Sequence, residues 1–133
     1  MKFYIAASLR NRELVREVSM SLSLKGHIHT YDWTKNKQIE SIEDLARIGS
    51  EEIEGVAAAD TVIVLLPAGK GSHIEMGMGI ALGKRVIIYS ENTDLNLLAE
   101  TSTFYHVPEV EQVIGPIEGL YDYLENKGRR ECK

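Results

Sequence analysis

Short apolar runs alternate along the chain with stretches in which apolar residues recur at helical spacing. This alternation is typical of an α/β fold, in which strands and helices follow one another. The third run, Thr61–Leu66, is continuously apolar and rich in β-branched residues, as expected for a strand covered on both faces. The predicted strands are Lys2–Ala7, His27–Trp33, Thr61–Leu66, Arg85–Tyr89 and Phe104–Val107.

The helices predicted between these strands are marked by residues that begin or end a helix. Asn11 precedes the first helix and Gly26 follows it, while Pro116 suits the first turn of the last one. Ser41 begins a capping box, in which a side-chain oxygen accepts a hydrogen bond from the amide three residues on. Gly49-Ser50 predicts a break, so that two short helices rather than one precede the third strand.

Strands joined through helices favour a parallel sheet, because each crossover brings the chain back in the same direction. We therefore expect a five-stranded parallel sheet in a three-layer sandwich, with the flavodoxin-like order 2-1-3-4-5. The polar connection between Ser90 and Ser102 should hold a turn or short helix. Ligands of such sheets bind beyond the carboxyl ends of the strands, where three loops meet: Ser8–Arg12, Asp32–Lys37 and Ala68–His73.

Size and charge narrow the class of protein. The 133 residues suit one domain over residues 1–127, followed by a flexible tail at 128–133. Twenty acidic against fifteen basic residues leave a formal charge of −5, which argues against a nucleic-acid polymer as partner. Cys132 is the single cysteine, so a reducing compartment is expected. With no signal-like or membrane-spanning segment in the sequence, we expect a cytoplasmic protein.

The segment after the third strand has the composition of a loop that binds an anion. Gly69 and Gly71 permit a close approach between backbone and ligand, and the helix that follows offers unpaired N–H groups. A phosphate or carboxylate would fit there, so Ser72 and His73 join the two glycines as candidates for substrate binding. The glycines and Lys70 have the wrong spacing for a Walker A loop, so ATP hydrolysis is not indicated.

Further candidates lie on neighbouring loops. Ser8 and Arg10 offer a hydroxyl and a guanidinium group to a phosphate, although an ordinary solvated turn has the same composition. Trp33 follows the second strand at the ligand end, where it would either stack on a base or cover the edge of the core. No second histidine or cysteine lies at metal-ligand spacing from His73, so neither a metal site nor a cofactor is expected.

Glu75 has two interpretations. In the sequence Ser72-His73-Ile74-Glu75 it completes a capping box, so its carboxylate would bind the amide of Ser72. The glycines around it and the strand end beside it favour a functional carboxylate instead. Tyr4 lies in the middle of the first strand, where a buried hydroxyl needs a partner, and a carboxylate at the tip of the next strand would serve.

Three segments carry a likeness to a known family. They are Tyr4-Ile5-Ala6-Ala7-Ser8, then Glu52-Ile53-Glu54-Gly55-Val56 leading to Ala59-Asp60, and Gly71-Ser72-His73-Ile74-Glu75-Met76-Gly77 followed by Ala81-Leu82-Gly83-Lys84. Over residues 1–89 the chain resembles the nucleoside 2-deoxyribosyltransferase family. The superfamily also contains 2'-deoxynucleoside 5'-monophosphate N-glycosidases.

The resemblance implies chemistry at an N-glycosidic bond. Glu75 matches the family's nucleophile, which attacks the anomeric carbon and forms a glycosyl-enzyme, and Tyr4 matches the tyrosine that orients it. Glu52 stands where the family has an aspartate near the reacting groups. Gly69 stands where transferases often carry aspartate and monophosphate glycosidases serine. Family members assemble as homodimers or higher oligomers, which implies that residues 90–102 complete a neighbour's base pocket.

We therefore expect an enzyme that cleaves or transfers at the N-glycosidic bond of a (deoxy)ribonucleoside or its 5'-monophosphate. Ser8-Leu9-Arg10 is similar to the phosphate-holding first loop of the hydrolase branch, which fits a 5'-monophosphate best. One alternative is a phosphoribohydrolase of the lysine-decarboxylase-like group, whose Pro-Gly-Gly-x-Gly-Thr-x-x-Glu motif is similar to residues 67–75. The earlier glycine-rich loop of that group is absent after Ala7. Another is a non-catalytic nucleotide-binding or sensing module, which the departures at Glu52 and Gly69 favour.

Overall fold

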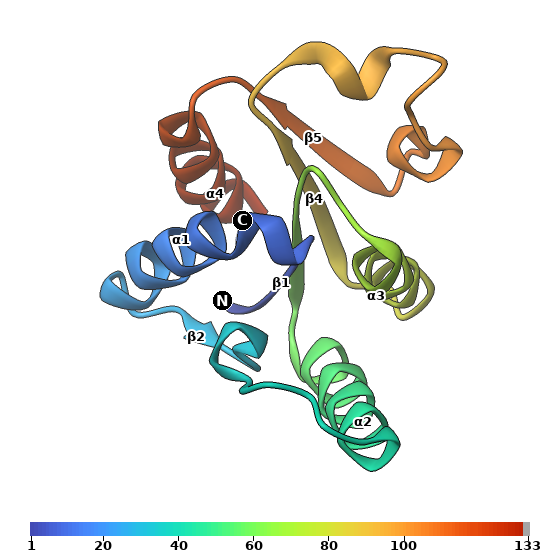
Figure 1. Ribbon diagram of the computed structural model, residues 1–133. Coiled ribbons are helices and arrows are strands. Elements are labelled where there is room, and N and C mark those ends of the chain that lie inside the picture. Colours follow the sequence, from blue (N-terminus) through green and yellow to red (C-terminus); the bar gives the residue numbers. More distant parts are fainter. Residues whose placement is uncertain (132–133) are drawn as a thin grey trace.

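The computed structural model describes residues 1–131 as a three-layer α/β sandwich around a parallel sheet (Figure 1). The order β2-β1-β3-β4-β5 confirms the predicted flavodoxin-like topology. Helices α1 and α4 cover one face of the sheet, and α2 and α3 cover the other (Figure 1). The strands are β1 (Lys2–Ala7), β2 (Ile28–His29), β3 (Thr61–Leu65), β4 (Arg85–Ser90) and β5 (Val110–Ile114), and the helices are α1 (Arg12–Leu24), α2 (Ile42–Ala58), α3 (Lys70–Ala81) and α4 (Ile117–Glu131).

The three central strands form most of the core. Every residue of β3 is buried, as the continuous apolar run predicts for a strand covered by helices on both faces. In the parallel register Tyr4 pairs with Val62 and Leu65 pairs with Tyr89. The carboxyl ends of β1, β3 and β4 therefore lie at one edge of the sheet, and the loops that follow them begin there.

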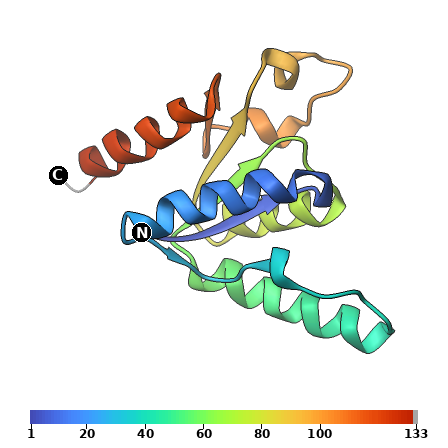
Figure 2. The same cartoon turned by 60° about the vertical axis from the view of Figure 1, so that its left-hand side comes forward.

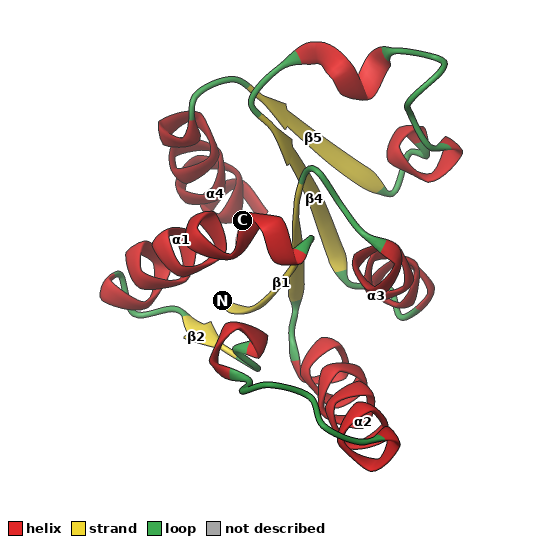
Figure 3. Ribbon diagram, in the orientation of Figure 1, coloured by secondary structure: helices red, strands yellow, loops and turns green. Residues whose placement is uncertain are grey.

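Helix α2 is one uninterrupted helix, so the predicted break at Gly49-Ser50 is wrong (Figure 3). Ser41 caps it as predicted, since its Oγ accepts a hydrogen bond from the Asp44 amide at 3.1 Å. A glycine inside a helix costs only about 1 kcal/mol relative to alanine, which favourable contacts along the rest of the helix outweigh.

The second and fifth strands differ from the sequence prediction. Only Ile28–His29 pairs with β1, because the chain turns at Asp32, whose Oδ1 accepts the Thr34 amide at 3.0 Å and begins the 3-10 helix η2 (Trp33–Lys35). The predicted strand Phe104–Val107 is wrong. This segment belongs instead to the 3-10 helix η4 (Thr103–His106), which the Ser102 side chain caps, and β5 follows it.

The connection between β4 and β5 projects beyond the sheet (Figure 2). It holds the predicted short helix as η3 (Thr93–Asn96), whose Leu95 is buried. At the other end of the chain, α4 runs to Glu131 and includes residues 128–131 of the predicted tail. Cys132 lies outside the described residues. In the part of the chain that the structure describes, no helix has the length and apolar character needed to cross a membrane.

Gly55 allows α2 to lie close against β1. A Cβ atom added there would lie 2.7 Å from the Tyr31 Cβ and 3.1 Å from two ring carbons of Tyr4. Real Cβ atoms do not approach at 2.7 Å, so any larger residue would push α2 away from the sheet. The close approach fixes the position of α2 beside the Tyr4 ring.

Gly55→Ala should therefore destabilise the protein, by about 1–3 kcal/mol in the free energy of unfolding, because a rigid Cβ would collide with Tyr31. Gly49→Ala is the matched control in the same helix, where an added Cβ meets no atom within 4 Å. It should stabilise the protein by about 0.5–1 kcal/mol through helix propensity. Urea unfolding measures both. Equal stabilisation by the two substitutions would contradict the close packing at Gly55.

Candidate active site

The β3–α3 loop begins α3 in a different way from the predicted capping box. Gly69 is the cap, and the Ser72 Oγ accepts the Gly69 N–H at 2.5 Å and donates to the Gly69 carbonyl at 3.0 Å. Ser72 is thus the third residue of the helix and not its cap. Glu75 lies one turn further along, and its carboxylate hydrogen-bonds to a different partner.

That partner is Tyr4. The Tyr4 hydroxyl donates to Glu75 Oε2 at 2.7 Å, across 71 positions of sequence. Tyr4 is fully buried in β1, and Glu75 is only 6% exposed. A carboxyl group with so little access to water keeps its orientation through such a bond, because few other donors reach it. The hydrogen bond holds Glu75 against the end of the sheet.

Glu52, from α2, is a second carboxyl group at this site. Burial, a hydrogen bond with Glu52 and the Glu52 charge together raise the pKa of Glu75 to about 8, against the opposing effect of the Tyr4 hydrogen bond. Burial and the nearby Glu75 charge raise the pKa of Tyr4 far above its ordinary value, so its hydroxyl remains a donor. Glu75 therefore keeps its proton until about pH 8.

A pocket of about 800 Å³ opens over this pair of carboxyl groups. It brings together residues from the first βα loop, the η2 turn, α2 and the start of α3. The predicted site residues that line it are Ser8, Trp33, Glu52, Gly69, Gly71, Ser72 and Glu75.

Two of these residues have structural partners as well. The Trp33 indole N–H donates to the Ile5 carbonyl at 2.7 Å, and the side chain is only 8% exposed. The hydrogen bond and the burial hold the ring in one position. Trp33 therefore covers the core edge and borders the pocket at the same time. The Ser8 Oγ accepts the Arg10 amide at 3.3 Å and caps the 3-10 helix η1 (Leu9–Asn11).

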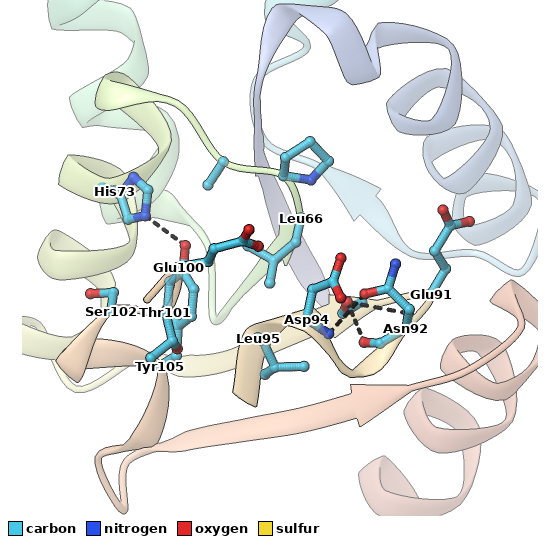
Figure 4. Close-up of a pocket in the computed structure, with 13 residues that line it drawn as sticks. Leu66, His73, Glu91, Asn92, Asp94, Leu95, Glu100, Thr101, Ser102 and Tyr105 are labelled. Carbon is cyan, nitrogen blue, oxygen red and sulfur yellow. Dashed lines mark hydrogen bonds between the residues drawn. The ribbon is translucent and has the colours of Figure 1, made fainter. Parts of the chain in front are cut away.

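Two other predicted residues lie elsewhere. The Arg10 side chain is exposed and is not among those bordering this pocket. His73 borders a separate cavity of about 570 Å³, where it hydrogen-bonds to Tyr105 (Figure 4). Although Arg10 and His73 are close in sequence to residues of the pocket, each belongs to a different surface.

The pocket also contains residues that the sequence did not single out. Arg12, Lys37 and Lys70 add three cationic groups, all on or beside loops that were expected to meet here. Leu45 and Ile48 add apolar surface from α2. Their helical spacing was visible in the sequence. However, an apolar helix face that borders a pocket has the same spacing as one that packs on the core, so the sequence does not distinguish them.

The donor groups at this site do not form a metal centre. Among the side chains that the structure describes, those of residues 1–126, no group of three or more histidine, cysteine, aspartate or glutamate residues lies together as metal ligands would. The charged groups that border the pocket are the carboxyl groups of Glu52 and Glu75 and the cationic side chains of Arg12, Lys37 and Lys70, and the Tyr4 hydroxyl contacts Glu75.

A sequence model of the family described as nucleoside 2-deoxyribosyltransferase matches residues 3–110. The chain belongs to the nucleoside 2-deoxyribosyltransferase family. The matched range includes Tyr4, Glu52 and Glu75, so the carboxyl pair and its tyrosine lie within the family domain.

Comparison with solved structures supports the same fold. A CMP N-glycosidase from Clostridium botulinum is similar, with a TM-score of 0.60 over 94% of this chain and 99% of that one. At 17% sequence identity, this likeness concerns the fold of the nucleoside 2-deoxyribosyltransferase domain. No curated protein sequence matches the chain.

The raised pKa of Glu75 predicts a stability that depends on pH. Between its ordinary pKa of 4.5 and about 8 the folded state binds more protons than the unfolded state, so the free energy of unfolding falls as pH rises through this range. Glu75→Gln removes the ionisable group and retains an acceptor for Tyr4. The melting temperature of the variant should exceed that of the wild type by an amount that grows from pH 5 to about pH 9.

Thermal denaturation followed by circular dichroism measures this difference. Glu54→Gln, at an exposed position of α2, is the control and should show no such growth. A difference for Glu75→Gln that stays constant across the pH range would contradict the raised pKa.

Proposed function

We propose that the protein cleaves the N-glycosidic bond of a nucleoside or its 5'-monophosphate, with Glu75 as the nucleophile. The observation that carries the proposal is the buried Tyr4–Glu75 hydrogen bond at a pocket of nucleotide size. Membership of the nucleoside 2-deoxyribosyltransferase family supports this reaction type. The proposal includes a covalent glycosyl-enzyme intermediate.

In the first step, a Glu75 carboxylate oxygen attacks the anomeric carbon of the sugar. The C–O bond forms as the C–N bond to the base breaks, and the electron pair of that bond leaves with the base. The Tyr4 hydroxyl holds one Glu75 oxygen, which leaves the other oriented for attack. Because the carboxylate has few water contacts, its negative charge acts strongly on the oxocarbenium-like transition state.

Glu52 is the proton donor for the departing base in this proposal. It lies at the pocket beside Glu75, and the proton that Glu75 holds at neutral pH passes to Glu52 as the substrate binds, which leaves Glu75 as the carboxylate nucleophile. In the second step Glu52 takes a proton from water, whose oxygen attacks the anomeric carbon and releases Glu75. A second base in place of water gives transfer instead of hydrolysis.

The cationic groups favour a 5'-monophosphate over a free nucleoside. Arg12, Lys37 and Lys70 border the pocket of a protein whose formal charge is −5. The first backbone N–H groups of α3 have no partner within the helix and lie at the positive end of its dipole. Both features favour the binding of an anion at the start of α3. A phosphate bound there would place the sugar between the glycine loop and Glu75.

Base release from a panel of nucleosides and 5'-monophosphates, with and without a second free base, tests the proposed reaction by chromatography. Glu75→Ala should abolish release, and the wild type quenched in acid should carry the mass of a glycosyl group that this variant lacks. Tyr4→Phe should lower kcat by up to about a hundredfold, because the carboxylate loses its orientation.

Tyr89→Phe is the matched control, since its hydroxyl donates to the Gly115 carbonyl outside the pocket. It should retain wild-type turnover. Release that persists in Glu75→Ala would refute Glu75 as nucleophile. If no substrate turns over while a nucleotide raises the melting temperature, the protein is a binding module.

The proton held by Glu75 predicts how activity depends on pH. For a substrate whose base must be protonated, kcat/KM should fall above about pH 8, where Glu75 loses the proton that it would pass to Glu52. A sugar phosphate bearing a pyridinium leaving group needs no proton, because the base departs neutral. Its kcat/KM should not fall above about pH 8.

Glu52→Gln provides the control for the same assignment. It should slow the ordinary substrate by about 10²–10⁴-fold and leave the pyridinium substrate much less affected. Equal losses for both substrates would show that Glu52 is not the proton donor.

A further inference from the structure

A hydrogen-bonded pair of aromatic side chains lies outside the catalytic pocket and contacts its wall. His73 Nδ1 lies 2.7 Å from the Gly69 carbonyl oxygen, and His73 Nε2 lies 2.7 Å from the Tyr105 hydroxyl. The two rings are stacked, with 5.7 Å between their centroids and 9° between their planes. Figure 4 shows this hydrogen bond beside the second cavity, with His73 reaching from α3 toward Tyr105.

The chemistry of the two contacts fixes the direction of each hydrogen bond. A carbonyl oxygen only accepts, so His73 Nδ1 carries the hydrogen in the bond to Gly69. In the neutral ring Nε2 then accepts, and the Tyr105 hydroxyl donates to it. The result is a directed chain of hydrogen bonds from Tyr105 through His73 to the Gly69 peptide.

Gly69 depends on these hydrogen bonds for its position. Its N–H donates to the Ser72 Oγ, and its carbonyl accepts the Ser72 hydroxyl at 3.0 Å, the His73 amide at 3.1 Å and the His73 imidazole. An added Cβ at Gly69 would meet nothing closer than the Ser72 Oγ at 3.9 Å. Side-chain packing therefore does not confine the residue, and the polar contacts do.

Tyr105, at the other end of these hydrogen bonds, is itself held in place. The residue is only 7% exposed, its carbonyl accepts the Gln112 Nε2 at 2.8 Å from β5, and its amide donates to the Ser102 carbonyl at 3.1 Å. Since β5 is part of the sheet, the position of Tyr105 is tied to the core. The Gly69 carbonyl is in this way connected to the sheet through His73 and Tyr105.

We propose that His73 and Tyr105 are positioning residues, which hold the Gly69 peptide in the wall of the catalytic pocket and so determine affinity for a 5'-phosphorylated substrate. This inference rests on the proposed function. Gly69, Lys70 and Ser72 form the part of the wall where the phosphate is expected, while Glu75 lies a further turn along α3. Loss of the hydrogen bonds from Tyr105 through His73 to Gly69 should weaken phosphate binding and leave the attack by Glu75 unchanged.

Kinetics of Tyr105→Phe and His73→Phe with a nucleoside 5'-monophosphate test the proposal. Tyr105→Phe keeps the stacked ring and removes the donor, and His73→Phe keeps a ring and removes both hydrogen bonds. Tyr105→Phe should raise KM by about tenfold, the effect of one lost hydrogen bond, and His73→Phe by at least as much, with kcat changed by less than about twofold in both. For the nucleoside without phosphate, KM should stay within about twofold of the wild type. Tyr89→Phe is the control and should change neither constant.

Equilibrium binding separates this proposal from the proposed function. In the Glu75→Gln background, calorimetry should give an affinity for the 5'-monophosphate about tenfold weaker with Tyr105→Phe than without it, and equal affinities for the nucleoside. A wild type that turns over no substrate refutes the proposed function, while this binding difference still tests the pair. An unchanged affinity, an equal loss for both ligands, or a fall in kcat alone would overturn the positioning role. Melting temperatures confirm that each variant is folded.

Discussion

The burial of the Glu75 carboxyl group is the constraint on which the rest of the site depends. A carboxylate removed from water is costly unless donors satisfy it, and here the donor comes from the middle of a central strand. Tyr4 reaches Glu75 because β1 and β3 are adjacent and α3 packs against both strands. Gly55 then lets α2 approach the Tyr4 ring, which brings Glu52 to the same place. The packing of the core around Tyr4 and Gly55 therefore also determines the surroundings in which Glu75 is protonated.

The sequence predicts the sheet well where burial on both faces leaves a strong pattern. Thr61–Leu65 and Arg85–Tyr89 lie within strands as expected, because long apolar runs have few other uses in a chain of this size. Edge elements were harder to predict. Phe104–Val107 is as apolar as a strand, yet the Ser102 cap turns it into a 3-10 helix, and such local hydrogen bonds compete with strand formation. The continuous α2 was missed because tertiary packing outweighs one glycine.

The candidate site was predictable to the extent that it lies on the loops at one edge of the sheet. Ser8, Gly69 and Ser72 border the pocket because the parallel order brings their loops together. The contact between Tyr4 and Glu75 was predictable because a buried tyrosine hydroxyl needs a hydrogen-bond partner. By contrast, His73 was placed with the ligand on sequence proximity alone. Successive residues of a helix point about 100° apart, so His73 and Glu75 face different cavities.

The unbroken course of α2 has a mechanical consequence. Leu45, Ile48 and Glu52 recur at helical spacing on one stripe and all border the pocket. A hinge at Gly49 would separate the apolar contacts from the carboxyl group, whereas a rigid helix keeps their spacing constant. Any displacement of α2 that closes these apolar side chains on a ligand therefore moves the Glu52 carboxyl group with them. In the proposed reaction, contact with the base and the distance from the base to Glu52 change together.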